Sequence, residues 1–193
     1  MEEKVWITSD LHFGHSQPFL YEPRGFSSIE EHDRTIIENI NNTVMEDDTL
    51  YILGDLMLND TTYGMECLKQ IRCQDIRIIL GNHDTNSRVE LYKTLPNVCV
   101  IGYAALIKHK KWNFMLSHYP MATANLDDDK RPFCRVWNIC GHSHTKIWAD
   151  RQTNSIHCEL DAWDNYPVNI EHIKEMAKIL AGKTAYEKEF HNV

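Results

Sequence analysis

Five strand-like apolar runs of this chain end in the same way, in side chains that can bind metal ions. The run KVWIT leads into Ser9 and Asp10, and four later runs end in GD, GNHD, H and GHSH. Sites in α/β proteins form at the carboxyl ends of strands, so donors far apart in sequence can meet in one place. The residues at these five ends are Asp10, His12, Asp55, Asn82, His83, Asp84, His118, His142 and His144. We therefore predict one site built from all five strand ends.

The first half of the chain alternates strand-like and helix-like stretches. Ser28 and Glu31 have the spacing of a capping box, and an apolar stripe with helical period predicts a helix over 28–44. A shorter helix is expected over 62–71. Strands that alternate with helices are typical of an α/β fold.

The second half is predicted to be mostly β. The strand-like runs VCVIGYAALI, WNFMLSH, RVWNICGH and SIHCELD follow one another with little helix between them, and a helix is expected over 169–180. The long irregular stretch Tyr119–Phe133 is a candidate for function. The sequence contains no repeat or linker, so we expect a single domain over residues 1–193.

Composition excludes several classes of protein. No run approaches the roughly 18 apolar residues of a membrane span, and the N-terminus does not resemble a signal peptide, so we expect a cytoplasmic protein. The formal charge of −8 argues against binding of extended duplex nucleic acid. The six cysteines are scattered without a C-x-x-C pair, which indicates reduced thiols in or near the core.

The candidate ligands combine carboxylate, amide and imidazole groups. Such a mixed oxygen and nitrogen set suits Mn²⁺, Fe, Zn²⁺, Co or Ni better than Ca²⁺ or Mg²⁺. One ion needs only about four to six donors, so the larger set predicts two ions that share a bridging carboxylate. A single histidine at a strand end is usually an ordinary polar residue, and the prediction depends on all five ends together.

Taken in order, D-x-H, G-D, G-N-H-D, H and G-H-x-H resemble the signature of the calcineurin-like metallophosphoesterase superfamily. Within it, the chain is most similar to small bacterial and phage phosphoesterases that begin SDLHFGH. The resemblance implies a four-layer α/β/β/α sandwich of two mixed β-sheets flanked by helices. It also implies a hydrolase with a dinuclear metal centre and a small phosphorylated substrate, and we expect the two divalent ions to be most simply Mn²⁺.

The resemblance further implies a role for each matching residue. It assigns Asp10, His12 and His144 to the first metal, Asn82, His118 and His142 to the second, and Asp55 to both. A metal-bridging hydroxide would attack phosphorus, and His83 would protonate the leaving alkoxide. Asp84 either orients His83 or a neighbouring ligand, or caps the turn that follows.

Departures from the signature narrow the predicted substrate. Protein phosphatases of the superfamily carry an acidic or amide residue where this chain has Leu58, and its exonucleases are longer. We therefore expect a phosphodiesterase acting on a small or nucleotide-like substrate. The alternatives are a phosphomonoesterase, a nuclease for short single strands, and a non-catalytic scaffold such as a retromer subunit. The complete GNHD and GHSH motifs favour an enzyme over the scaffold.

Each of three further residues has two alternative interpretations. His15 either contacts substrate phosphate or a metal-bound water, or faces solvent from its loop. Arg24 and Arg131 either bind substrate phosphate through their guanidinium groups or are ordinary surface residues. The oligomeric state is left open. The histidines expected at the surface are His32, His109, His172 and His191.

Overall fold

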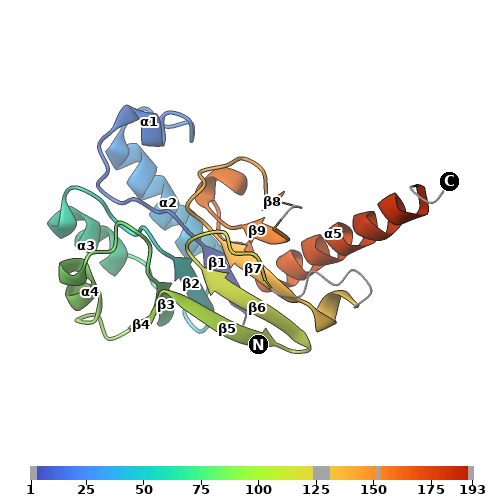
Figure 1. Cartoon of the computed structure of the whole chain (residues 1–193). Coiled ribbons are helices and arrows are strands. Elements are labelled where there is room, and N and C mark those ends of the chain that lie inside the picture. Colours follow the sequence, from blue (N-terminus) through green and yellow to red (C-terminus); the bar gives the residue numbers. More distant parts are fainter. Residues whose placement is uncertain (1–3, 124–130, 151–152, 191–193) are drawn as a thin grey trace.

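The computed structural model describes residues 4–123, 131–150 and 153–190. Two five-stranded β-sheets face each other, with helices around them (Figure 1). In strand order, the first sheet consists of β10 (Val168–Asn169), β1 (Val5–Thr8), β2 (Thr49–Leu53), β3 (Asp75–Ile79) and β4 (Val98–Gly102). The second consists of β5 (Ala104–His109), β6 (Trp112–Ser117), β7 (Val136–Cys140), β9 (Ser155–His157) and β8 (Ala149–Asp150). The predicted sandwich of two sheets flanked by helices is confirmed.

Both sheets are mixed, and their parallel strands determine where the loops emerge. Strands β1 to β4 pair in parallel, with Ile7 opposite Tyr51, and β6, β7 and β9 also pair in parallel. Strands β10, β5 and β8 are antiparallel to their neighbours. Because parallel strands end side by side, the segments after β1, β2 and β3 leave the first sheet together. The segments after β6 and β7 leave the second sheet in the same way.

Helices cover the outer face of the first sheet. They are α2 (Ile29–Thr43), α3 (Thr61–Lys69) and α4 (Asn86–Tyr92). Helix α2 packs its apolar face against alternate residues of the sheet, such as Leu50 and Ile52. Its N-terminus is capped as predicted, since the Ser28 hydroxyl accepts a hydrogen bond of 3.2 Å from the Glu31 amide. The Glu31 carboxylate, however, accepts from the Ser27 amide, so only half of the expected capping box is formed.

A second apolar layer lies between the two sheets. Leu53 of the first sheet joins Phe114 and Trp137 of the second in one buried cluster. Helix α5 (Ile170–Phe190) adds Ile173 and Ala177 to the same cluster and then extends away from the sheets (Figure 1). The helix begins as predicted but is longer than expected. Among the described residues, no helix combines the length and apolar character needed to cross a membrane.

The structure corrects three smaller expectations. VCVIGYAALI forms two strands instead of one, because the chain passes from β4 in the first sheet to β5 in the second at Gly102, whose φ is +133°. The short helices α1 (Pro18–Tyr21) and α4 were not predicted. All six cysteines are free thiols, but Cys99 and Cys134 are exposed and not in the core.

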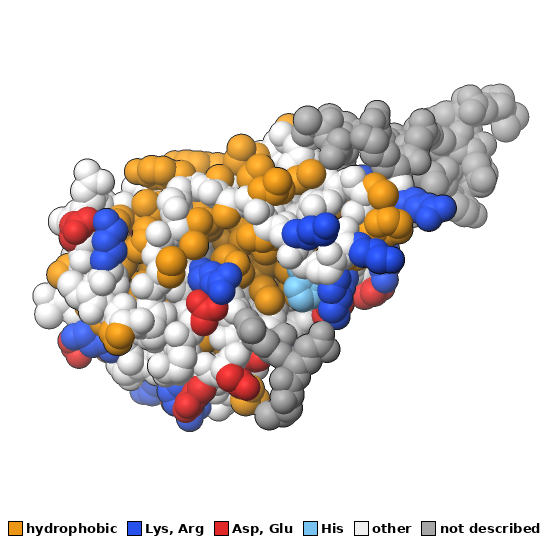
Figure 2. All heavy atoms as spheres, turned by 90° about the horizontal axis from the view of Figure 1, so that it is seen from below, with side chains coloured by type: hydrophobic (Ala, Val, Ile, Leu, Met, Phe, Trp, Pro, Cys, Tyr) orange, Lys and Arg blue, Asp and Glu red, His pale blue; other side chains and the backbone are white. Residues whose placement is uncertain are grey.

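The lower face of the molecule carries many exposed apolar side chains, with lysine, arginine and acidic groups among them (Figure 2). Exposed apolar residues also lie where the chain passes between the two edge strands β4 and β5. The most exposed of these are Ile101, Tyr103 and Leu106.

Candidate metal centre

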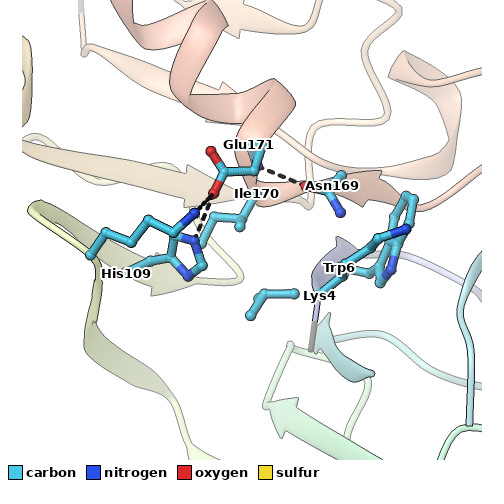
Figure 3. Close-up of a pocket in the computed structure, with 8 residues that line it drawn as sticks. Lys4, Trp6, His109, Asn169, Ile170 and Glu171 are labelled. Atoms are coloured by element: carbon cyan, nitrogen blue, oxygen red, sulfur yellow. Dashed lines mark hydrogen bonds and ion pairs between the residues drawn. The ribbon is translucent and has the colours of Figure 1, made fainter. Parts of the chain in front are cut away.

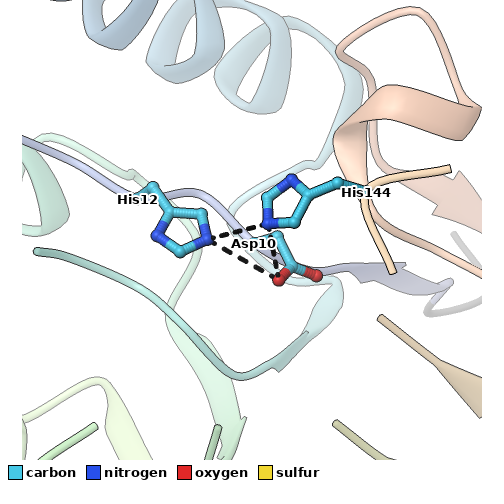
Figure 4. Close-up of side chains that lie close together, drawn as sticks. All are labelled: Asp10, His12 and His144. Atoms are coloured by element: carbon cyan, nitrogen blue, oxygen red, sulfur yellow. Dashed lines mark hydrogen bonds and ion pairs between the residues drawn. The ribbon is translucent and has the colours of Figure 1, made fainter. Parts of the chain in front are cut away.

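The ends of β1 and β7 bring the first three candidate ligands together (Figure 4). The His12 and His144 Nε2 atoms lie 3.7 and 3.6 Å from Asp10 Oδ1, and 3.2 Å from each other. These three ligand atoms lie within 4.8 Å of one another. This first donor group, Asp10, His12 and His144, therefore surrounds a space of the size that one ion requires.

The ends of β3, β6 and β7 supply a second donor group, Asn82, His118 and His142. His118 Nε2 lies 2.9 Å from Asn82 Oδ1 and 3.2 Å from His142 Nδ1. Asp55, which follows β2, lies between the two groups. Its Oδ2 atom is 3.5 Å from His118 Nε2 in the second group and 3.8 Å from His12 Nε2 in the first. Such a position suits a carboxylate that bridges two ions.

The chemistry of these donors fits divalent cations. Asp10 Oδ1 is buried and has no hydrogen-bond partner among the described residues, although it faces two imidazole nitrogens. A bound cation would satisfy this acceptor, whose isolation is otherwise unfavourable. Burial by itself raises the pKa of Asp10, but His12, His118 and His144 outweigh it, so the pKa is lowered. Burial lowers the pKa of His12. Both residues thus favour the unprotonated forms that bind metals.

Most of these residues have a backbone conformation that only tertiary contacts can hold. A φ between +20° and +160° is uncommon for residues other than glycine, although Asp, Asn and His tolerate it best. Such values accumulate at functional sites, where the surrounding structure maintains them. The residues and their φ values are Asp10 (59°), His12 (50°), Asp55 (53°), His142 (72°) and His144 (47°).

Glycines allow the strand ends to approach each other closely. A Cβ atom on Gly54 would lie 2.6 Å from the Gly81 nitrogen, and one on Gly81 would collide with the Asp55 carboxylate. A Cβ atom on Gly141 would overlap the Asp10 carboxylate. The glycines of the G-D, G-N-H-D and G-H-x-H motifs are therefore required by space, as is expected where backbones pack closely.

His83 and Asp84 have different positions relative to the donor groups. The His83 Nε2 atom lies 3.8 Å from Asp55 Oδ2, and its side chain is 39% exposed. The buried Asp84 carboxylate accepts hydrogen bonds from the amides of Asp55 (2.9 Å) and Gly81 (2.8 Å), and from the Tyr92 hydroxyl (2.8 Å). It therefore holds the Asp55 loop and does not contact the His83 ring. The alternative of a cap on the next turn is wrong, because Thr85 is the N-cap residue of α4.

The three residues with two readings occupy different environments. His15 is 7% exposed, so the solvent-facing alternative is wrong, and burial lowers its pKa. Its ring lies 5.7 Å from that of His12. The surface alternative for Arg24 is also wrong, because its side chain is 1% exposed. Its guanidinium contacts protein groups, which argues against a phosphate contact. Arg131 is exposed.

Sequence reasoning missed a buried group beside the first donor group. His32 was expected at the surface, but it is fully buried and contacts Asp33 and Arg24. Its position on α2 looks like an ordinary helix surface, so only the fold reveals its burial. Of the other histidines expected at the surface, His172 is exposed and His109 is partly buried. His191 and residues 124–130 of the candidate loop lie outside the described residues.

A separate cavity of about 420 Å³ lies at the start of β1 and of α5 (Figure 3). None of the candidate ligands is among the described residues that line it. Its Glu171 carboxylate accepts hydrogen bonds of 3.0 Å from both His109 and Lys110. This cavity is therefore not part of the candidate metal centre.

The two-sheet fold and the converging Asp, Asn and His side chains define a metallophosphoesterase. Residues 3–146 match the calcineurin-like phosphoesterase family, and the chain belongs to this family. Members of the family are phosphoester hydrolases that use divalent metals.

Relatives cover nearly the whole chain. An uncharacterised protein of Methanocaldococcus jannaschii is 29% identical over 180 residues, which are 90% of each chain. The Gene 66 protein of Mycobacterium phage L5 is 31% identical over 184 residues, covering 82% of this chain and 87% of that protein. A crystal structure of a protein of unknown function from Aquifex aeolicus has a TM-score of 0.66 and 21% identity, covering 91% of this chain and all of that one. That similarity concerns the fold alone.

Proposed function

We propose that this protein is a phosphodiesterase that acts on a small, nucleotide-like substrate with two divalent cations, most simply Mn²⁺. The observation that carries the proposal is the position of Asp55. Its Oδ2 atom lies within 3.8 Å of imidazole nitrogens from both donor groups and from His83. An arrangement of two adjoining donor groups with a shared carboxylate suits two-metal hydrolysis of phosphate esters.

The two donor groups would hold one cation each, with Asp55 in contact with both. When bound, such a pair of cations would activate a water molecule and neutralise the charge on the phosphoryl oxygens. The chain orients its ligands through the backbone. The Asp10 carboxylate accepts a 2.9 Å hydrogen bond from the His142 amide, and the Asp55 carboxylate accepts one of the same length from the His83 amide. These bonds link the loops that carry both groups.

We assign the role of general acid to His83. Its amide bond to Asp55 Oδ1 and the contact of its carbonyl oxygen with the Arg88 guanidinium hold the loop, while the ring stays partly exposed. A proton on Nε2 can therefore reach the oxygen of a leaving alkoxide at the open side of the site. Proton transfer to this oxygen is needed because an alkoxide is a poor leaving group.

Two exposed aromatic rings, one beside His15 and one beside the second donor group, support a nucleotide-like substrate. Phe19 is 72% exposed, and its ring lies 5.4 Å from that of His15. Tyr119 is 49% exposed, and its ring lies 4.5 Å from that of His142. Exposed aromatic rings of this kind stack on nucleobases, whose planar faces they match.

The test compares phosphodiester and phosphomonoester substrates across several cations. We expect the purified protein to hydrolyse bis-p-nitrophenyl phosphate with added Mn²⁺. Activity on p-nitrophenyl phosphate alone would instead identify a phosphomonoesterase, and cleavage of a short single-stranded oligonucleotide alone would identify a nuclease. A protein that shows no hydrolysis of any of these would be a scaffold.

The role of His83 has its own test. The variant His83→Ala should bind metal normally but turn over a substrate with an alkyl leaving group about 10²-fold more slowly, the scale of general acid catalysis. His172→Ala is the matched control, because His172 is exposed and its ring contacts Trp163. Unchanged turnover in a metal-loaded His83→Ala sample would remove this residue from the mechanism.

A further inference from the structure

We infer that Arg24 and Asp161, supported by His32 and Asp33, are positioning residues that hold the first donor group ready for its cation. This inference rests on the proposed function only in taking that group as a metal site. The four side chains form one buried network, with hydrogen bonds that run from helix α2 to His144. Nothing in the local sequence connects them, since Arg24 and Asp161 are 137 positions apart.

The centre of the network is a buried ion pair. The Arg24 guanidinium binds Asp161 with both sides of its fork, from Nε to Oδ1 at 3.2 Å and from Nη2 to Oδ2 at 2.7 Å. The two side chains are 1% and 8% exposed. A buried pair of this kind adds little net stability, because desolvation opposes the attraction. The pair therefore contributes a fixed geometry at this position more than it contributes stability.

The ion pair determines which nitrogen of His144 carries the proton. Arg24 Nη2 has two protons, and it donates them to Asp161 Oδ2 and to the Asp10 carbonyl oxygen at 3.0 Å. The contact of Nη2 with His144 Nδ1, at 3.3 Å, is the longest of the three and can use only a proton that already has a shorter contact. Asp161 Oδ2 is nearer, at 3.1 Å, and a carboxylate only accepts, so we assign the proton to His144 Nδ1, which donates it to Asp161. This leaves the lone pair on Nε2, the atom that faces Asp10 Oδ1.

The other side of the network, through His32 and Asp33, reaches the loop that carries Asp10 and His12. Arg24 Nη1 lies 3.0 Å from His32 Nε2, and arginine can only donate, so His32 must carry its proton on Nδ1. That proton is donated to Asp33 Oδ1 at 2.7 Å. The second Asp33 oxygen accepts a 2.8 Å hydrogen bond from the Gly14 amide. The proton position on His32 thus follows from the fact that arginine does not accept, and that on His144 follows from its shorter contact with the Asp161 carboxylate, which does not donate.

The network therefore holds both ends of the loop that carries His12. Arg24 binds the Asp10 carbonyl at one end, and Asp33 binds the Gly14 amide at the other. Asp10 and His12 have left-handed backbone conformations, which need support from their surroundings. One buried network supports this loop and also selects the tautomer of a ligand on a different loop.

The test uses Asp161→Asn and reads the tautomer of His144 in the metal-free protein. Long-range ¹H–¹⁵N correlation of histidine-labelled protein should show the Nδ1-protonated form in the wild type. His144→Gln assigns the signal. In Asp161→Asn the Nε2-protonated form should gain a clearly measurable population. A role in folding alone would not change this ratio.

Metal affinity gives a second readout. Mn²⁺ binding measured by calorimetry should weaken roughly 10- to 100-fold in Asp161→Asn, the range for loss of a partner that orients a ligand. Asp75→Asn is the matched control, because Arg77 binds Asp75 with the same fork, at 3.0 and 2.7 Å, on the exposed surface. The control should bind Mn²⁺ like the wild type.

Two results would overturn the inference: a wild-type tautomer ratio in Asp161→Asn, or wild-type Mn²⁺ affinity in this variant. If Asp161→Asn does not fold by circular dichroism, Asp33→Asn is judged by its Mn²⁺ affinity, since it removes support only from His32 and Gly14. The proposed function fails separately. If Mn²⁺ binding depends on Asp161 but the protein hydrolyses no phosphate ester, the proposed function is contradicted and the inference stands.

Discussion

The Asp84 carboxylate is the best place to test how the fold holds the bridging residue Asp55. Asp84 is 6% exposed and accepts four hydrogen bonds. Its Oδ2 atom accepts from the amides of Asp55 and Gly81, and its Oδ1 atom accepts from the Tyr92 hydroxyl and, at 3.3 Å, from the Leu56 amide. The variant Asp84→Asn keeps the size of the side chain and replaces one acceptor oxygen by a donor.

The structure allows the cost of Asp84→Asn to be worked out. The remaining oxygen serves best in place of Oδ2, where two amides converge. The new NH₂ group can donate to Tyr92 after its hydroxyl rotates, but the Leu56 amide loses its acceptor. One unsatisfied buried donor costs about 1–3 kcal/mol, and loss of charge weakens each of the two kept bonds by about 1 kcal/mol. Relief of repulsion with Asp55 returns about 1 kcal/mol. The net loss of unfolding free energy is therefore about 2–4 kcal/mol.

The assay is urea denaturation of the metal-free protein. Asp47→Asn is the control, since it makes the same chemical change at an exposed position, where the unfolding free energy should shift by less than about 0.5 kcal/mol. If Asp84→Asn is as stable as this control, the carboxylate does not hold the Asp55 loop through these bonds. The reasoning about the loop would then be refuted.

Three further predictions concern space, metal and pH. Gly141→Ala should weaken Mn²⁺ binding at least 10-fold in calorimetry, because the new Cβ overlaps the Asp10 carboxylate. Gly182→Ala is the control, since its Cβ meets open space, and equal affinities of the two variants would contradict the packing argument. A chelator should lower the Tm by roughly 5–11 °C compared with Mn²⁺ at 100 times its Kd, and an unchanged Tm would contradict a folded-state cation site. Burial lowers the pKa of His12 and His32, so the unfolded chain takes up protons first as the pH falls below the ordinary value of 6.5. Stability of the metal-free protein should therefore fall below pH 6.5 in thermal melts, and a flat profile in this range would be inconsistent with buried neutral imidazoles. His144 has the opposite effect in a different range: Asp161 and Asp10 outweigh its burial and raise its pKa, so its contribution to stability is lost as the pH rises above 6.5.

The sequence by itself determined the residues that could bind metal and the order of the elements that carry them. Apolar runs that end in Asp10, Asp55 and His118 are local patterns, and the direction of parallel strands brings such ends together. The helix over 28–44 was predictable for the same kind of reason, because its cap and its apolar stripe are read within a few turns.

Only the tertiary structure decided how these residues are held. The left-handed backbone of the ligands, the passage between sheets at Gly102 and the burial of His32 depend on contacts that no local pattern encodes. The clearest case is Arg24, which the sequence could describe only as a phosphate ligand or a surface residue. Its partner Asp161 lies 137 positions away, so the environment of its charge exists only once the chain has folded. Local periodicity determines which face of an element is apolar, but long-range packing determines which polar groups are enclosed with it.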